Sequence, residues 1–350
     1  MRHKILILVC FLLALVSCTR EETPGGALRI EFETGALQTK SDAPDGIVAE
    51  GGGIFIDNGT PDLVILLADS STGDIAATYP GTGVISGTPG ETRMSVTFTG
   101  LTGSATYTVY AFANTQGLWT MKTGGSGGTT VSNLTDLTSA TQVEGLQFWP
   151  VSADLDPFDC PAVKNERLPL SAKGTVTLTA TGNGEISLAM LRCVAKVTAV
   201  FENQYGENLA LSNFTCSFAH MHPETGFVVP HDSDFPVSRE SAPDLSATVS
   251  SLTIPAEDDP ETETREDQAS ISWYVFPSIG PYTCDISFTL NAEDHGYTDL
   301  PVHDDHARDI SQLARNQHLT ITTRIGKGKN VSFNFEVSGW DDKTETVTFN

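Results

Sequence analysis

The chain has 350 residues and a formal net charge of −24, from 44 acidic and 20 basic side chains. A surface this acidic repels phosphate backbones, which argues against nucleic acid as a partner. The hydrophobic fraction of 39% is enough for well-formed cores, and the length suggests two domains.

The first 17 residues form a predicted signal peptide. A positive start (residues 2–4) precedes an apolar run (residues 5–16) that is short for a membrane span. The run ends in Leu15-Val16-Ser17-Cys18, which resembles the lipobox of bacterial lipoproteins. Such a site predicts cleavage before Cys18 and a lipid on its thiol. An ordinary secretory signal is the alternative, and the acidic pair Glu21-Glu22 is similar to a surface-export signal.

Residues 27–33 read as one strand close to the start of the mature chain. A basic residue, Lys40, follows it, and Ser41 opens an exposed turn-forming segment of the kind that proteases reach. The strand is either an ordinary edge of the fold or a temporary element that is later replaced. Its apolar residues alternate with charged ones and therefore share one face: Leu28, Ile30 and Phe32.

The remainder of the chain alternates short β-rich runs with Gly, Pro, Asp and Asn clusters, which predicts β-sandwiches. A turn or so of helix is expected only within residues 306–318. We predict an all-β protein whose two sandwich domains, residues 41–180 and 181–350, follow a signal peptide (residues 1–17) and a propeptide (residues 18–40). The expected strands lie at 62–69, 94–101, 105–114, 174–182, 192–203, 213–221, 246–255, 270–277, 283–292, 318–325, 330–340 and 345–350.

Four cysteines remain once Cys10 leaves with the signal peptide and Cys18 is lipidated. Four cysteines allow three disulfide pairings in an oxidising compartment. Most of them lie in apolar strand-like runs, so free buried thiols are equally open. The absence of a Cys-x-x-Cys pair argues against zinc. The four are Cys160, Cys193, Cys216 and Cys284.

Candidate metal and catalytic residues do not assemble into a recognisable motif. His220 and His222 share a strand face, residues 303–306 hold two histidines and two aspartates, and residues 154–159 hold three aspartates. None of these clusters has a complete ligand set. No Gly-x-Ser-x-Gly or His-Glu-x-x-His motif occurs. We therefore expect no enzyme activity, metal or cofactor.

Glycan binding is the main alternative function, because sugars stack on exposed aromatic rings. Trp119 lies near a Gly-rich segment and is the candidate for exposure. Trp149, Trp273 and Trp340 have apolar neighbours, which predicts core positions.

Several segments resemble the fimbrillin family, the subunits of type V pili. Residues 168–172 (Leu-Pro-Leu-Ser-Ala) and 191–197 are similar to the family's Leu-Pro-Met-Ser-Gly-like stretch and the Leu-x-Arg-x-Val-Ala-Lys-Val strand after it. Residues 106–114 resemble its Tyr-x-Val-x-Ala-x-Ala-Asn strand, and 274–278 its Tyr-Val-Phe-Pro-Asn. Residues 315–349 are similar to its closing pattern of Arg-Asn, strands and Trp. These segments follow the family's order.

The resemblance implies two transthyretin-like β-sandwich domains in a surface lipoprotein of the outer membrane. In the family, a trypsin-like protease removes the propeptide with its first strand, and a strand of the next subunit fills the groove. The matching cut falls between Lys40 and Ser41, although the family's site is usually arginine, with Arg20 and Arg29 as alternatives. The donor strand or groove partner would be the C-terminal segment, with Val331, Phe333, Phe335, Val337, Val347 and Phe349 alternating.

The implied partners are other pilus subunits in a head-to-tail polymer, and the outer membrane through the lipid on Cys18 before processing. A host glycan or protein receptor is a further partner. Without the cut, the strand and the lipid stay, and the protein is a pilus anchor or a glycan-binding surface lipoprotein. Arg192 and Lys196 are expected on one outward strand face, solvated or paired with a carboxylate.

Overall fold

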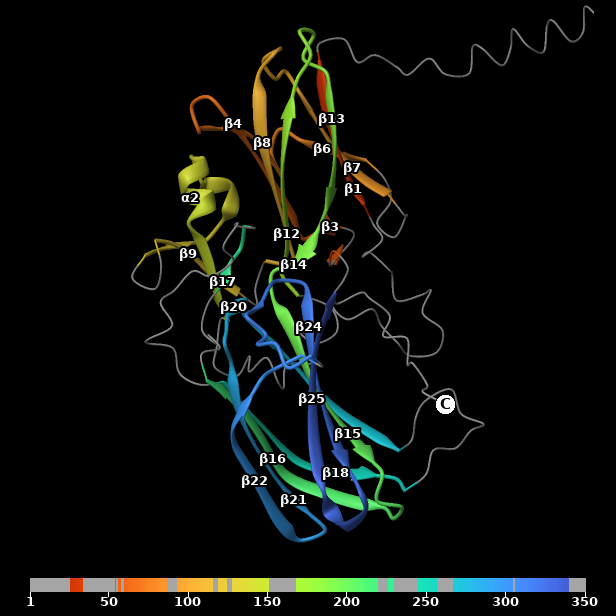
Figure 1. The fold of residues 1–350 in the computed structure, drawn as a ribbon. Helices are drawn as coiled ribbons and strands as arrows, with labels where there is room; N and C mark the ends of the chain where they lie inside the picture. Colours follow the sequence, from red (N-terminus) through yellow and green to blue (C-terminus); the bar gives the residue numbers. More distant parts are fainter. Residues whose placement is uncertain are drawn as a thin grey trace, which may run out of the picture.

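Strands dominate the part of the chain that the computed structural model describes: residues 26–33, 54, 56–57, 60–86, 93–115, 119–124, 128–150, 168–219, 226–229, 245–256, 267–304 and 306–339. The all-β prediction is confirmed. Figure 1 shows an elongated molecule with two lobes, each built from stacked sheets.

The first lobe is a sandwich of two sheets, in the upper half of Figure 1. One has four strands in the order β13-β1-β7-β6, and the other has five in the order β14-β12-β8-β4-β5. The first comprises β13 (Gly184–Ala189), β1 (Ala27–Glu33), β7 (Arg93–Thr99) and β6 (Val84–Ser86); the second comprises β14 (Leu191–Arg192), β12 (Leu170–Thr177), β8 (Thr106–Ala113), β4 (Leu63–Asp69) and β5 (Ile75–Tyr79).

The five-stranded sheet is covered on both faces, which explains the continuous apolar run in β4. Ile65 and Leu67 enter the core shared with β1, whereas Val64 and Leu66 enter a middle core on the other face of the sheet. Successive strand residues point to opposite faces, so an uninterrupted apolar run fills both cores.

A third sheet and a short helix cover that second face. The sheet has the order β10-β9-β11-β17. The sequence prediction missed this helix, whose start is capped by Ser139, and placed one within residues 306–318, where the described residues form no helix. These elements are β10 (Thr129–Val131), β9 (Trp119–Thr123), β11 (Leu146–Pro150), β17 (Gly226–Phe227), the 3-10 helix η2 (Leu134–Asp136) and the helix α2 (Ala140–Glu144).

The second lobe is a sandwich of two four-stranded sheets, in the lower half of Figure 1. Their orders are β19-β15-β24-β25 and β18-β16-β21-β22, and one core lies between them. The strands are β19 (Gln268–Val275), β15 (Ala195–Asn203), β24 (Gln317–Ile325), β25 (Val331–Gly339), β18 (Leu245–Ile254), β16 (Leu209–Ala219), β21 (Thr283–Leu290) and β22 (Glu293–Pro301).

Minor elements complete the described chain. Two small sheets pair β2 (Ile56–Asp57) with β3 (Thr60–Pro61) and β20 (Ser278–Ile279) with β23 (Gln312–Leu313). The 3-10 helix η4 (Lys327–Lys329) joins β24 to β25. The domain boundary expected at residue 180 falls in the turn between β12 and β13, and both of these strands belong to the first lobe.

Candidate functional site

The first strand of the chain is an interior strand of its sheet. β1 pairs in parallel with β13, Leu28 opposite Gly184 through Glu33 opposite Ala189, and antiparallel with β7. Its interpretation as an ordinary edge strand is therefore wrong. Both rows of its backbone hydrogen-bonding groups have partners, so β1 closes the sheet on two sides.

The inward face of β1 supplies three central side chains of the first core. Leu28 and Ile30 are 0% exposed and Phe32 is 1% exposed. The alternation that the sequence indicates is confirmed by this burial. On the outward face, Arg29 forms an ion pair with Glu31 at 2.9 Å.

The start of β1 is fixed by two local contacts. Gly26 has a φ of +59°, and a Cβ there would lie 2.4 Å from the Thr181 carbonyl oxygen. This backbone conformation and this close approach both favour glycine. Ala27 then donates its backbone N–H to Asn183 Oδ1 at 3.0 Å, which holds β1 against the turn before β13.

The C-terminal strand that the sequence indicates as a candidate donor, β25, lies in the second lobe. Among the described residues, β25 is an edge strand whose one partner is β24, from Gln317–Gly339 to Ile325–Val331. Phe335 is buried, and Val331, Phe333 and Val337 are half-buried against the second core. Phe333 packs edge-on against Tyr297 of β22 at a centroid distance of 4.9 Å. Within one molecule, β1 and β25 belong to separate cores and do not share a sheet.

Most of the segments that resemble the fimbrillin family meet at the joint between the lobes. Leu168, Cys193, Val194, Tyr274 and Phe276 pack in the core next to the five-stranded sheet. This middle core takes side chains from both lobes. Most of the quoted motifs therefore mark the joint, whereas the motif at residues 315–349 also includes the candidate donor strand β25.

A buried guanidinium organises the joint. Arg315, 8% exposed, donates through Nη2 to Ser171 Oγ at 2.8 Å and to Cys193 Sγ at 2.9 Å. Its Nε and Nη1 reach the carbonyl oxygens of Arg192 and Val228 at 3.3 and 3.4 Å. This role of Arg315 was not predicted from the sequence. The Arg-Asn pair just before an apolar strand was the feature that could have pointed to it.

The expectation that Arg192 points outward is wrong. Arg192 is 3% exposed and donates from Nη1 to Asn316 Oδ1 at 2.9 Å. The cause is a break between β14 and β15: Cys193 and Val194 turn the chain from one lobe to the other, so Arg192 and Lys196 are not in one strand. Spacing along a presumed continuous strand therefore misplaced the side chain.

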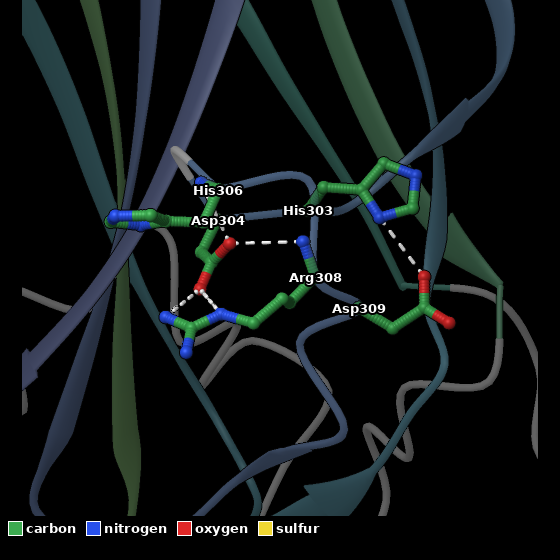
Figure 2. Close-up of polar contacts among 5 residues, drawn as sticks. All are labelled: His303, Asp304, His306, Arg308 and Asp309. Carbon is green, nitrogen blue, oxygen red and sulfur yellow. Dashed lines mark hydrogen bonds and ion pairs between the residues drawn. The ribbon is translucent and has the colours of Figure 1, made fainter.

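Charged side chains of the loop after β22 contact other residues of the same loop (Figure 2). Asp304 accepts hydrogen bonds from the Arg308 side chain, at 2.7 Å to Nε, and from the backbone of His306 and Arg308. These hydrogen bonds, first that of the Arg308 side chain, lower the pKa of Asp304 to about 2. His303 Nδ1 lies 2.9 Å from Asp309 Oδ1.

No group of three or more metal-ligating side chains occurs among the described residues. The carboxylates of Asp304 and Asp309 contact other residues of the same loop. His220, His222 and residues 154–159 lie outside the described residues, so the other clusters in the sequence stay predictions.

The tryptophan expected at the surface is in a core. Trp119 is 9% exposed and packs edge-on against Phe148 at 5.0 Å and Phe276 at 6.3 Å. Its place in β9 turns the ring under the five-stranded sheet. Trp273 is 0% exposed, as predicted. The side chains of Trp149 and Trp340 are not described.

The described cysteines are free and buried: Cys193, Cys216 and Cys284. Burial raises the pKa of the Cys216 thiol well above its usual value, with smaller contributions from Cys284 and Asp285. Burial, followed by Asp285, raises the pKa of Cys284 to about 12. The Cys216 and Cys284 thiols are therefore protonated and act as apolar core groups.

The remaining predicted site residues lie outside the described residues: Cys18, Lys40, Ser41, Cys160, Val347 and Phe349. No helix in the described part of the chain is long and apolar enough to cross a membrane.

Comparison with solved structures finds similar chains at low identity. A candidate cell adhesion protein from Bacteroides eggerthii is 13% identical, with a TM-score of 0.49, over 90% of this chain and 96% of its own. A candidate polysaccharide-binding protein from Bacteroides thetaiotaomicron is 12% identical, with a TM-score of 0.43, over 90% and 96%. A fimbrial protein from Bacteroides ovatus is 9% identical, with a TM-score of 0.27, over 88% of this chain and 49% of its own.

No family model and no curated protein matches the chain. With TM-scores below 0.5, the similar structures do not assign a function to it.

Proposed function

We propose that this protein is a structural and adhesive subunit of a surface fimbria, exported as a lipoprotein and assembled by protease-triggered strand exchange. The observation that supports this most is the placement of β1. It is the first described element of the chain, yet it fills an interior position with three core side chains. A cut after β1 would separate it from the body without passing through another described strand.

Loss of β1 would create a groove that a strand can fill. The backbone groups of β7 and β13 that face β1 would lose their partners, and the core would lose Leu28, Ile30 and Phe32. An open edge beside an apolar groove is a site for strand addition. Because donor and groove are different surfaces, the contact is head-to-tail, and where its rotation does not close into a ring it extends into a filament.

The C-terminal segment is the proposed donor or groove partner. β25 alternates apolar and polar side chains and, in the part of the chain that the structure describes, has one neighbour in its sheet. Val347 and Phe349 continue the alternation in the sequence. Backbone pairing then gives affinity, and the alternating side chains select the register.

The proposed cut lies between Lys40 and Ser41, after the end of β1. Arg29 is the weaker alternative as a cleavage site, because it lies within β1, opposite residues of both neighbouring strands, and its side chain forms an ion pair with Glu31. A protease needs an accessible, extended segment, and an interior strand does not offer one. If the cut does not occur, the protein keeps its lipid on Cys18 and serves as an anchor or a surface binding lipoprotein.

The proposal predicts that a chain that starts at Ser41 polymerises and a chain that starts at Thr19 stays monomeric. Light scattering and electron microscopy of both chains at equal concentration measure this. Removal of residues 340–350 from the chain that starts at Ser41 is the matched test of the donor, and growth is expected to stop. Monomers from both starting points would contradict the proposal.

A further inference from the structure

The two-sided pairing of β1 has a consequence for the order of events in assembly. A strand at the edge of a sheet can be peeled away along one row of hydrogen bonds. β1 instead lies between β7 and β13 and is paired along its length with both. Each of the three inward side chains is almost completely buried. A cut in the segment that follows β1 breaks none of these contacts.

β13 depends on β1 for its place in the sheet. In the described part of the chain, β13 is the terminal strand of its sheet and β1 is its one hydrogen-bonded strand neighbour. Leu188, opposite Phe32, is 5% exposed and packs in the same core as β1. Departure of β1 therefore leaves β13 without a ladder, and unpaired backbone groups in a partly apolar setting are costly.

We infer that proteolysis alone does not empty the groove: after the cut, β1 stays bound between β7 and β13, and it leaves only when β13 opens with it. This inference rests on the proposed function, and it adds a control step to that function. The cut subunit is a stable, closed monomer, and the opening of the β1–β13 pair sets the rate at which the groove becomes available to another strand.

The test uses the chain of residues 19–350 with a site-specific protease sequence inserted after Lys40. Once a denaturing gel shows complete cutting, native mass spectrometry measures whether the N-terminal fragment remains. We expect the mass of the uncut chain plus one water, because hydrolysis adds a water and the fragment stays. Hydrogen exchange at the amides of residues 184–189 is expected to be unchanged by the cut. A body without its fragment directly after cutting would overturn the inference.

Two substitutions on opposite faces of β1 test the cause of retention. Exchange of the bound fragment for an isotopically labelled peptide of residues 26–40 gives the release rate. Ile30→Ser is expected to speed release roughly tenfold or more, because Ile30 is fully buried. Arg29→Gln, on the exposed face, is the matched control and is expected to change the rate less than about twofold. Equal rates for both variants would contradict the inference.

Ile30→Val is the milder variant to use if Ile30→Ser prevents folding. Its release rate is expected to be higher than the rates of wild type and Arg29→Gln, but lower than the rate of a variant in which β1 is disrupted. Exposure of residues 184–189 to exchange is expected to rise in step with release. Release with β13 still protected would overturn the coupling of the two strands.

Because the cut is engineered, this test is independent of natural processing: a surface protein that still begins at Cys18 would contradict the proposed function and leave the retention result standing.

Discussion

At the residue scale, the buried polar groups at the joint are the feature least accessible from sequence. Arg315 and Ser171 are 144 positions apart, yet their side chains are 2.8 Å apart. Arg315 donates its hydrogen bonds to acceptors that lie in β12, in β14 and the turn after it, and at Val228. No spacing rule links these positions, because the lobes must first fold and dock. Sequence reasoning could mark the motif but could not assign its partners.

Replacement of Arg315 by methionine is expected to lower the free energy of unfolding by about 3 kcal/mol. The variant keeps much of the side-chain volume but removes the guanidinium donor from Ser171 Oγ and from two carbonyl oxygens, of which Val228 O still accepts from Ser171 Oγ. Denaturant unfolding measures the loss. Arg324→Met is the matched control, since Arg324 is itself exposed where it pairs with Glu202 at 2.7 Å, and its expected loss is about 1 kcal/mol or less. Equal losses would contradict the role given to Arg315.

His318 predicts a pH dependence of stability. Burial, followed by the positive charge of Lys196, lowers the pKa of His318 to about 4 in the folded protein. An unfolded histidine titrates near about 6.5. Between these values the unfolded chain binds more protons than the folded chain, so the folded state loses stability as the pH falls from about 6.5 toward 4.

The His318→Gln variant isolates that contribution, because glutamine does not titrate and can still contact Thr198 Oγ1, which lies 2.8 Å from the histidine Nε2. We expect the drop in melting temperature between pH 7 and pH 5 to be smaller in the variant than in wild type. His306→Gln, at an exposed position, serves as the control and should behave like wild type. An unchanged drop in His318→Gln would contradict the assignment.

At the element scale, alternation of apolar and polar residues predicted most strands and the buried face of β1. It could not predict which strands are neighbours, so β1 was open to interpretation as an edge strand. β1 pairs in parallel with β13, although the two strands are distant in the sequence: Ala27 and Asn183, which share a hydrogen bond, are 156 positions apart. The tertiary fold sets this pairing. The short helix α2 also escaped prediction, because a helix of 5 residues has too few turns to show a period.

The inward residues of β25 provide a test of that strand as a packed element. Phe335→Ala is expected to lower the free energy of unfolding by about 3 kcal/mol, since Phe335 is 6% exposed in the second core. Ser332→Ala on the outward face of the same strand is expected to change it by less than about 0.5 kcal/mol. Thermal or denaturant unfolding of both variants measures the difference. A similar loss in both would show that β25 is not held by its inward face.

At the scale of the whole molecule, the structure has three cores where the sequence indicated two domains. The middle core contains Val64 and Tyr110 from the first lobe, and Tyr274 of β19 and Phe276, just after the end of β19, from the second. Glu144 of α2 accepts a hydrogen bond from Tyr110 Oη at 2.6 Å and pairs with Lys173 Nζ at 2.8 Å, which holds the helix over the sheet. The joint is therefore a packed interface.

This arrangement separates the two roles that the proposed fimbrial subunit needs. The joint and the middle core keep the lobes together, whereas β1 and β25 belong to different lobes (Figure 1). A groove in one lobe and a donor in the other suit head-to-tail contacts between copies.

The N-terminus of the protein on the intact cell surface tests the central claim most directly. Mass spectrometry of surface-labelled protein identifies the first residue of the body and any bound N-terminal fragment. The account predicts a body that begins at Ser41, with β1 removed or replaced in assembled material. A body that begins at a lipid-modified Cys18, with residues 27–33 still in the chain, would contradict it.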